Sequence, residues 1–351
     1  MGAHGATFGR LLAYGDRVDK RQRARGQWDT ISSPFDHPPA KTWLEEVARL
    51  GLAVVEPFCG AGNLVRMLPN VNWQGLYDIE LRTTFGLAIE QRDTIADFPR
   101  QIDGSKYGAV ITNPPWLSRR SARMRAICIE GGAYDDLYKE ALAVCLAHVA
   151  YVAAIVPESF ATSGLFLDRL QAIVSLPYDV FGGLTEHPAC LALFAPADGR
   201  NVSIWRGDLY IGTLAELRRH PIWMLRESDI AKVRFYRPQG TIALYGMDSR
   251  TGPSIRFSAG DEVEPGRVKR SSRHVQRLDL DIELPQEQIL RVVKTANAIL
   301  EEFRRTTCDV TLTAARARRK DGSFRRRLDF DTAARILTLA LKAEGIHPSR
   351  A

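Results

Sequence analysis

The junction between a short apolar run and a pair of prolines constrains the fold of this chain more than any other feature. Residues 109–111, Ala-Val-Ile, have the composition of a buried strand. Pro114 and Pro115 follow closely, and proline lacks the N–H that a sheet ladder requires, so the strand must end there. The sequence therefore predicts a buried strand that leads into a turn made of Asn113, Pro114, Pro115 and Trp116.

The same turn has the chemistry to hold an amino group on a planar ring. It presents the side chain of Asn113 and the carbonyl of Pro114 beside the flat indole of Trp116. An exocyclic NH2 group needs two acceptors for its hydrogens and a surface on which its ring can stack. Prolines after a strand are also ordinary turn chemistry, so the interpretation depends on the sequence around them.

A second pattern of strand, turn and helix lies upstream. The apolar residues 52–55 lead into residues 56–62, Glu-Pro-Phe-Cys-Gly-Ala-Gly, and then into a helical pattern at residues 64–68. Glycines in such a turn let the backbone approach a nucleoside cofactor. A dinucleotide fingerprint would have a third glycine where this chain has Val65, which excludes that alternative.

An acidic pair follows the next predicted strand. Residues 73–77 form that strand, which ends in Asp78-Ile79-Glu80. A carboxylate at the end of the second strand of a doubly wound sheet can accept hydrogen bonds from ribose hydroxyls. The glycine turn, the acidic strand end and the Asn-Pro-Pro-Trp turn follow one another in this order, and their combination is far more specific than any one of them.

In these motifs the chain resembles the S-adenosylmethionine-dependent amino-methyltransferases. The resemblance is to the N6-adenine DNA methyltransferases in which the cofactor motif comes first, the catalytic motif second and the target-recognition region last. It covers residues 30 to 197. It implies a Rossmann-like α/β sheet followed by a smaller C-terminal α+β region, S-adenosylmethionine as cofactor and double-stranded DNA as partner. It also implies an enzyme of restriction–modification type, encoded by a bacterium, phage or plasmid.

The resemblance assigns the cofactor-binding roles residue by residue. The cofactor loop corresponds to Glu56, Phe58, Gly60 and Gly62. Asp78 or Glu80 corresponds to the acceptor of the ribose hydroxyls. Asp93 resembles the acid that contacts the cofactor's adenine, with Asp97 as the alternative, because the segment before it is short, holds Gly86 and leaves room only for a stunted helix. Pro38-Pro39, before a predicted helix at residues 43–50, resembles the element that closes over the methionine end.

The resemblance also assigns the catalytic roles. The Asn113 side-chain oxygen and the Pro114 carbonyl would accept the two hydrogens of adenine N6, while Pro115 completes the turn. The target base would be flipped out of the duplex and stacked between Trp116, which stands where Tyr or Phe is more frequent, and Phe181. For Phe181, packing in the core is nearly as good an interpretation. The chemistry requires no metal.

Composition is compatible with a two-domain enzyme of the reducing cytoplasm. The chain has 351 residues, of which 45% are hydrophobic, enough for ordinary cores. The first apolar patch, residues 11–14, is too short for a secretory signal or a membrane span. The five cysteines are scattered, without a Cys-x-x-Cys pair or histidines at ligand spacing, which argues against structural zinc.

Basic residues gather in the C-terminal part of the chain. The formal net charge is +7, which suits a polyanionic partner. An Asp321-Gly322 pair between two arginine-rich runs predicts a hairpin whose guanidinium groups project from its tip. We favour phosphate contacts over a merely solvated surface there. The hairpin residues expected to contact DNA are Arg318, Arg319, Lys320, Arg325, Arg326 and Arg327. Residues 118–125 predict a mobile basic loop beside the substrate, with Arg119 and Arg120 as further DNA contacts.

The sequence divides into three predicted parts. Residues 1–30 form a basic amino-terminal arm, residues 31–197 the catalytic domain, and residues 198–351 the target-recognition region. In the last part, strands are expected at residues 234–236, 241–245 and 254–257. Helices are expected from Pro285 onward and at residues 332–344, the latter ending at Gly345.

Two other functions remain open at the level of sequence. The same motifs occur in methyltransferases that act on adenine in structured RNA or on a protein glutamine, whose side-chain amide also presents an NH2 group. The long basic region favours nucleic acid over a protein substrate but separates DNA from RNA poorly. A non-catalytic DNA-binding relic of the fold is the second alternative, and the intact turn motifs argue against it.

Overall fold

The structure is a computed structural model of the chain. It describes residues 24–82, 86–101, 104–127, 132–182, 187–196, 201–269 and 274–347. Contacts between Cα atoms divide the chain into two compact units. The first comprises Met1–Asp36, Ala40–Val156 and Val180–Thr185, and the second His37–Pro39, Pro157–Asp179 and Glu186–Ala351. Residues 1–23 of the predicted arm lie outside the described residues, and the three-part division remains a prediction.

The first unit is built on parallel strands. They are β1 (Val54–Glu56), β2 (Trp73–Asp78), β3 (Glu90–Gln91), β4 (Ala109–Thr112) and β5 (Tyr151–Pro157), in the spatial order β3-β2-β1-β4-β5. The pairs β1–β2, β1–β4, β2–β3 and β4–β5 are all parallel. This is the order of the Rossmann fold. Every residue of β4 is buried, which confirms the buried strand predicted before the prolines.

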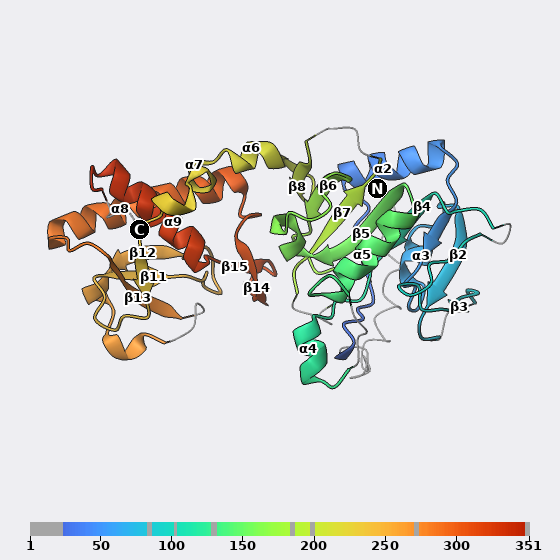
Figure 1. The fold of residues 1–351 in the computed structure, drawn as a ribbon, viewed down its shortest axis with the longest axis horizontal. Helices are drawn as coiled ribbons and strands as arrows, with labels where there is room; N and C mark the ends of the chain where they lie inside the picture. The colour runs from blue at the N-terminus through green and yellow to red at the C-terminus, as the bar shows by residue number, and fades with distance from the viewer. Residues whose placement is uncertain are drawn as a thin grey trace, which may run out of the picture. The chain divides into compact units, whose positions relative to one another are not determined.

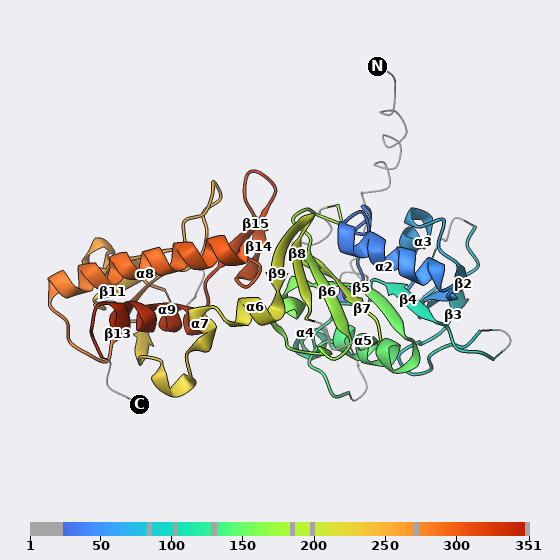
Figure 2. The ribbon, with the colours of Figure 1, turned by 90° about the horizontal axis from the view of Figure 1, so that it is seen from above.

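Helices lie on both sides of these strands. They are α2 (Pro38–Arg49), α3 (Asn63–Met67), α4 (Arg119–Met124) and α5 (Leu137–His148). Figure 2 shows α2 and α5 on opposite sides of β4 and β5. Trp43 of α2 packs edge-on against Tyr151 at the start of β5, with ring centroids 6.2 Å apart. The helix α5 begins where the Asp136 side chain caps the backbone N–H of Tyr138.

The structure corrects one prediction in this unit. Residues 118–125 were expected to form a mobile loop, but they contain α4, whose first turn is capped by Ser118 accepting a hydrogen bond from the N–H of Ser121. The expectation was wrong because the polar run supplies an N-cap and helix-forming arginines. Between Glu80 and Asp93, where a stunted helix was expected, the described residues contain β3 and no helix.

The second unit begins with four sheet strands of mixed direction. They are β6 (Leu170–Ser175), β7 (Ala189–Phe194), β8 (Ser203–Arg206) and β9 (Leu209–Thr213), in the order β7-β6-β8-β9. The pair β6–β8 is parallel, whereas β6–β7 and β8–β9 are antiparallel. Short helices flank these strands, namely η2 (Glu158–Thr162), α6 (Leu214–Arg218), α7 (Pro221–Met224) and η3 (Glu227–Asp229).

The rest of the second unit is an α+β layer structure. Four antiparallel strands lie in the order β10-β13-β11-β12, with bounds Val233–Phe235, Val275–Leu280, Ile242–Tyr245 and Arg256–Ala259. The helices α8 (Gln286–Thr307) and α9 (Phe330–Ala343) lie against this sheet, as Figure 1 shows. The short helices η4 (Gly260–Glu262) and η5 (Pro265–Arg267) lie between β12 and β13 in the sequence. An antiparallel hairpin of β14 (Thr313–Arg318) and β15 (Phe324–Arg327) separates the two long helices in the sequence.

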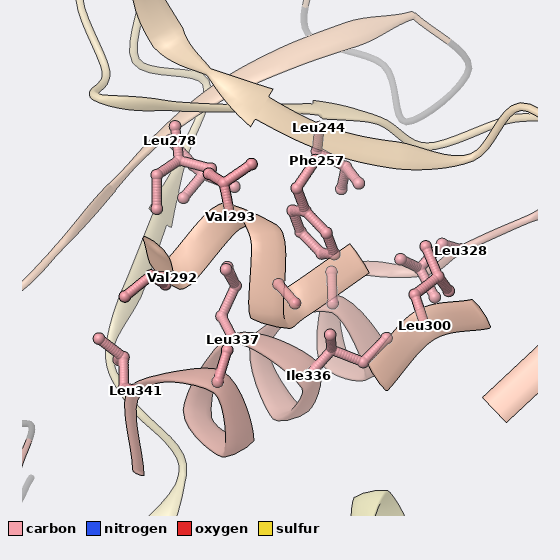
Figure 3. Packing of buried hydrophobic residues seen from close by; sticks show 14 of the residues in the cluster. Leu244, Phe257, Leu278, Val292, Val293, Leu300, Leu328, Ile336, Leu337 and Leu341 are labelled. Carbon is pink, nitrogen blue, oxygen red and sulfur yellow. The ribbon is translucent and has the colours of Figure 1, made fainter. Parts of the chain in front are cut away.

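The helix predicted from Pro285 onward is present as α8. The apolar positions of this helix are all buried in one cluster, namely Ile289, Val292, Val293, Ala296, Leu300 and Phe303. Figure 3 shows Val293 near Leu278, and Leu244 near Phe257, between the sheet and the helices. Burial of each large apolar side chain contributes about 1.5–3 kcal/mol, so this face determines how α8 packs.

The fold class is therefore the predicted one. A Rossmann-like α/β sheet is joined in the same chain to a smaller C-terminal α+β region with small sheets. The predicted Asp321-Gly322 hairpin is present, with Gly322 at φ 85 in its turn. In the described part of the chain, no helix is both long and apolar enough to cross a membrane.

Candidate functional site

A cavity lies at the carboxyl ends of β1, β2 and β4. The strand order reverses at β1, with β2 on one side and β4 on the other, and such switch points are where open α/β sheets bind ligands. About 70 Å3 of the cavity is accessible to water. The residues around it are Gln27, Trp28, Asp29, Thr30, Glu56, Phe58, Cys59, Gly60, Asn63, Leu64, Asp78, Ile79, Arg82, Asn113 and Pro115.

The loop after β1 forms one wall of this cavity and contains three of the predicted cofactor residues, Glu56, Phe58 and Gly60. Gly60 and Gly62 have φ values of 55 and 79, a region that L side chains rarely adopt. A Cβ atom at Gly62 would lie 2.2 Å from Cδ1 of Leu87, so a side chain there would displace its neighbour. Glycine at this position lets the loop pass close to Leu87 where it enters α3.

Asp78 holds the loop in place from the end of β2. Its carboxylate accepts hydrogen bonds from the backbone N–H of Gly60 at 2.7 Å and of Glu80 at 2.9 Å. Burial raises the pKa of Asp78, against the effect of these two hydrogen bonds. Glu80, the other candidate ribose acceptor, is half-exposed and pairs with Arg25 at 2.8 Å. Of the two acids, only Asp78 lines the cavity.

Glu56 is a buried carboxyl at the base of the cavity, with a side chain that accepts hydrogen bonds from Thr112 Oγ1 and from the backbone N–H of Phe58. Burial raises its pKa to about 8, although both hydrogen bonds act in the opposite direction. The group therefore carries a proton at neutral pH. Cys59 is its neighbour in the loop, and burial raises the pKa of that thiol as well, which excludes a thiolate nucleophile.

Asn113 has an incompletely bonded side chain. Its Nδ2 donates to the carbonyl of Trp28 at 2.6 Å and to Thr30 Oγ1 at 3.3 Å. Its Oδ1 is buried, and no donor in the described part of the chain reaches it. A buried acceptor without a partner costs about 1–3 kcal/mol, so this oxygen is suited to a ligand that brings a donor.

The two predicted stacking aromatics are covered in this structure. Trp116 is 9% exposed, donates from Nε1 to the carbonyl of Ile155 at 3.3 Å and meets Phe181 edge-on, with ring centroids 5.1 Å apart. Phe181 is 1% exposed and belongs to the core, which is the alternative that its sequence context left open. Neither ring lines the cavity, although Pro115 and Asn113 of the same turn do.

The remaining predicted cofactor residues lie elsewhere. Asp93 is exposed, and its Oδ1 accepts hydrogen bonds from the backbone N–H groups of Ile95 and Ala96. Asp97, the alternative, is exposed and pairs with Arg92 at 2.6 Å. Neither acid lines the cavity. Pro38 is the first residue of α2 and belongs to the second unit.

Sequence reasoning missed the wall formed by residues 27–30. Arg82 holds this segment through Asp29 at 3.3 Å and Gln27 at 2.6 Å. These residues were assigned to a basic arm because the charged run before them dominates the composition. The available signal was the change from arginines to a Trp-Asp-Thr triplet before the first predicted helix.

The structure corrects the expected direction of the hairpin arginines. Arg326 is 3% exposed, and its guanidinium makes a bidentate pair with Glu158, with N–O distances of 2.7 and 3.1 Å. Arg318 pairs with Asp179 at 2.9 Å and lies over the ring of Phe324. These guanidinium groups do not project from the hairpin, because carboxylates of the same unit bind them.

Asp248 binds further arginines of this hairpin. It is fully buried and pairs with Arg304 at 2.9 Å and with Arg319. Its backbone carbonyl accepts a hydrogen bond from Nε of Arg325 at 2.6 Å. Burial alone would raise the pKa of Asp248, but the hydrogen bonds from Arg304 and its other donors lower it to about 2. Lys320 is exposed and Arg327 is half-buried.

The helix α4 presents basic side chains in the first unit, directly after the Asn-Pro-Pro-Trp turn. Arg119 turns inward and donates to the carbonyl of Tyr134 at 2.6 Å and to Glu140 at 3.1 Å. Arg120 and Arg123 are exposed. Of the two arginines predicted here as DNA contacts, only Arg120 is placed on the surface.

Metal ligands are not gathered at this site. Within the described ranges, no group of three or more His, Cys, Asp or Glu side chains is arranged to hold a metal ion. The fold and the cavity define a Rossmann-like α/β protein with a crevice at its switch point. Its polar groups are carboxyls at two strand ends and an unpaired amide oxygen.

Comparisons with known proteins give only weak likenesses. No model of a protein family and no curated protein matches the chain. Among solved structures, it is similar to a candidate class I S-adenosylmethionine-dependent methyltransferase from Listeria monocytogenes, with 13% identity over 50% of this chain and 67% of that one and a TM-score of 0.33.

Two further structures are similar at the same level. One is the modification subunit of a candidate type I restriction enzyme from Vibrio vulnificus, with 16% identity over 52% of this chain and 47% of that one and a TM-score of 0.34. The other is a candidate RNA methyltransferase from Pyrococcus horikoshii, with 13% identity over 51% and 100% of the two chains and a TM-score of 0.31. The chain thus spans about half of the Vibrio subunit, and TM-scores this low carry no argument about function.

Proposed function

We propose that this protein transfers the methyl group of S-adenosylmethionine to the N6 amino group of an adenine flipped out of DNA. The observation that carries the proposal is the buried Oδ1 of Asn113, in a turn at the wall of the cavity, which accepts no hydrogen bond from the described residues. An acceptor without a donor fits a substrate that brings an NH2 group. The order of the sequence motifs and the switch-point cavity support the same function.

The chemistry proposed for Asn113 follows from the nature of the amino group. The lone pair of an exocyclic NH2 is delocalised into the ring, so the nitrogen is a poor nucleophile while its hydrogens lie in the ring plane. Acceptors placed at Asn113 Oδ1 and at the Pro114 carbonyl would draw these hydrogens out of the plane and localise the lone pair. Positioning and electrostatics would then supply most of the catalysis.

The residues of the cavity suit the polar groups of the proposed cofactor. When bound, S-adenosylmethionine supplies an electrophilic methyl group on a positively charged sulfur. Glu56 and Asp78 provide carboxyls beside the glycine loop, and Asp78 or Glu80 would accept the ribose hydroxyls. Asp93 remains our proposed contact to the adenine ring of the cofactor, with Asp97 as the alternative.

The cavity must widen to admit a ligand of this size. Its water-accessible space of about 70 Å3 is below the roughly 300 Å3 at the lower end of small-molecule pockets. The side chain of Arg82, held by Asp29 and Gln27, is part of the wall that closes it. These are long or polar side chains, which can move at less cost than the buried strands beneath them.

We infer that Arg120 and Arg123 of α4 supply phosphate contacts close to the reacting base. They are exposed, and they follow the catalytic turn by only a few residues in the first unit. Lys320 of the hairpin remains a candidate contact in the proposed target-recognition region. For Arg318, Arg319, Arg325 and Arg326, pairing within the protein favours a structural role.

Labelled methyl transfer tests the proposal most directly. The full chain would be incubated with labelled S-adenosylmethionine and with duplex DNA, transfer RNA and total protein in parallel, followed by nucleoside and amino-acid analysis. Label in N6-methyladenine from DNA is the expected result. Label in RNA or in glutamine would show that the substrate is RNA or protein and not DNA. If calorimetry detects no binding of the cofactor, the proposal is overturned.

A further inference from the structure

The amide of Asn113 has both of its hydrogens bonded, while its oxygen has no partner. Nδ2 carries two hydrogens, and two acceptors lie within reach, the Trp28 carbonyl at 2.6 Å and Thr30 Oγ1 at 3.3 Å. Oδ1 is buried and receives no hydrogen bond from the described residues. Both hydrogens of the Asn113 amide are thus bonded within the protein, whereas its oxygen can still accept a hydrogen bond.

This bonding pattern allows only one orientation of the amide. A rotation of 180° about the last side-chain bond would exchange Nδ2 and Oδ1. The oxygen would then lie against the carbonyl oxygen of Trp28, and neither atom has a hydrogen to share. The Thr30 hydroxyl could serve either orientation, so the Trp28 carbonyl sets the orientation and Thr30 binds the second hydrogen.

The segment that carries these acceptors is fixed against the catalytic turn. The carbonyl of Gly26 accepts a hydrogen bond from the backbone N–H of Trp116 at 2.8 Å, and the N–H of Ile31 donates to the carbonyl of Val180 at 2.8 Å. Gly26 has φ 70, and a Cβ atom there would lie 2.0 Å from the carbonyl oxygen of Trp116. Only glycine permits this close approach.

We propose that residues 26–30 are a positioning element of the catalytic site. The Trp28 carbonyl and the Thr30 hydroxyl hold the Asn113 amide so that its oxygen is kept for the amino group of the substrate. The catalytic consequence rests on the proposed function, whereas the fixed amide orientation does not. Thr30 is 3% exposed, and its hydroxyl is the part of this arrangement that a side-chain substitution can remove.

Hydrogen exchange of the Asn113 side chain tests, without any assay of activity, whether Thr30 holds the amide. The Asn113 NH2 resonances would be identified by their loss in Asn113→Ala. Thr30→Val keeps the shape of the side chain and removes the acceptor, so NH2 exchange with solvent should accelerate about tenfold, as expected for one lost hydrogen bond. Thr30→Ser keeps the hydroxyl and should retain the protection of the native protein. Equal exchange in Thr30→Val and the native protein would overturn the proposal.

Single-turnover methyl transfer tests the consequence for catalysis. At saturating S-adenosylmethionine, Thr30→Val should lower the rate about tenfold, and Thr30→Ser should restore the rate. If Thr30→Val and Thr30→Ser transfer methyl groups at the same rate, the Thr30 hydroxyl has no role in catalysis. If the native protein transfers no methyl group, the proposed function fails. The exchange measurement still shows whether Thr30 holds the Asn113 amide.

Gly26→Ala is a second variant, for the case that Thr30→Val folds poorly. It alters neither acceptor chemically but must move the segment away from Trp116. Faster exchange of the Asn113 NH2 group is expected if the segment positions this amide. Native exchange in a folded Gly26→Ala protein would contradict the proposal.

Discussion

Replacement of Glu56 by glutamine should make the protein more stable at alkaline pH. Burial raises the pKa of this carboxyl from the ordinary 4.5 to about 8, against the hydrogen bonds from Thr112 and from the N–H of Phe58. Between these pH values the folded state holds a proton that the unfolded state releases. Stability should therefore fall as the pH rises from about 4.5 to about 8, and should level off above that, where both states are ionised.

The size of the effect follows from the two pKa values. The gap between 4.5 and about 8 corresponds to an upper limit of about 5 kcal/mol, at 1.36 kcal/mol per pKa unit. Glutamine is neutral at every pH and keeps an acceptor oxygen for the Thr112 hydroxyl. The Glu56→Gln protein should therefore lack this fall and should be more stable than the native protein above about pH 8.

Urea unfolding followed by circular dichroism, at about pH 5 and about pH 8.5, would measure the difference. Glu45→Gln is a matched control, because Glu45 is exposed on α2 and its substitution should leave the pH dependence unchanged. If Glu56→Gln and the native protein lose the same stability between the two pH values, the carboxyl does not hold the proton that its burial implies.

Four further variants test the site and the hairpin. Asn113→Ala should raise the barrier to methyl transfer by about 3 kcal/mol or more and leave cofactor affinity nearly unchanged, as turnover and calorimetry would report. Asp78→Asn should weaken cofactor binding about tenfold, since the carboxylate also holds the N–H of Gly60. The double variant Arg120→Ala, Arg123→Ala should weaken DNA binding and reduce the log–log salt slope by about one per lost phosphate contact. Arg326→Ala should lower the free energy of unfolding by about 3–5 kcal/mol, because it leaves a buried carboxylate unpaired.

Local sequence was sufficient to predict the strands and turns that frame the site. An apolar run followed by prolines can end only in a turn, and glycines at positive φ are required where the loop after β1 bends. The Asp321-Gly322 pair specified the hairpin for the same reason, because few other residues adopt the backbone angles of such a turn. These predictions depend on a handful of neighbouring residues.

The partners of the side chains could not be predicted in this way. Arg326 meets Glu158 across 168 positions of the chain, and Asn113 meets Thr30 across 83. Neither pairing can be predicted from the residues nearby in the sequence, because any exposed position tolerates an arginine and many loops contain a threonine. Phe181 shows the same limit, since an aromatic residue before a strand suits a stacking surface and a core equally well.

The pairing of the arginines changes what the positive charge of the chain implies. In a chain of net charge +7, the arginine-rich runs of the hairpin were expected to contact nucleic acid. A guanidinium that already makes a bidentate pair with a buried carboxylate would have to break that pair before it could bind a phosphate. Exposed arginines next to the catalytic turn face no such cost. Arg120 and Arg123 are therefore better placed than the hairpin to hold a DNA backbone while a base is turned towards Asn113.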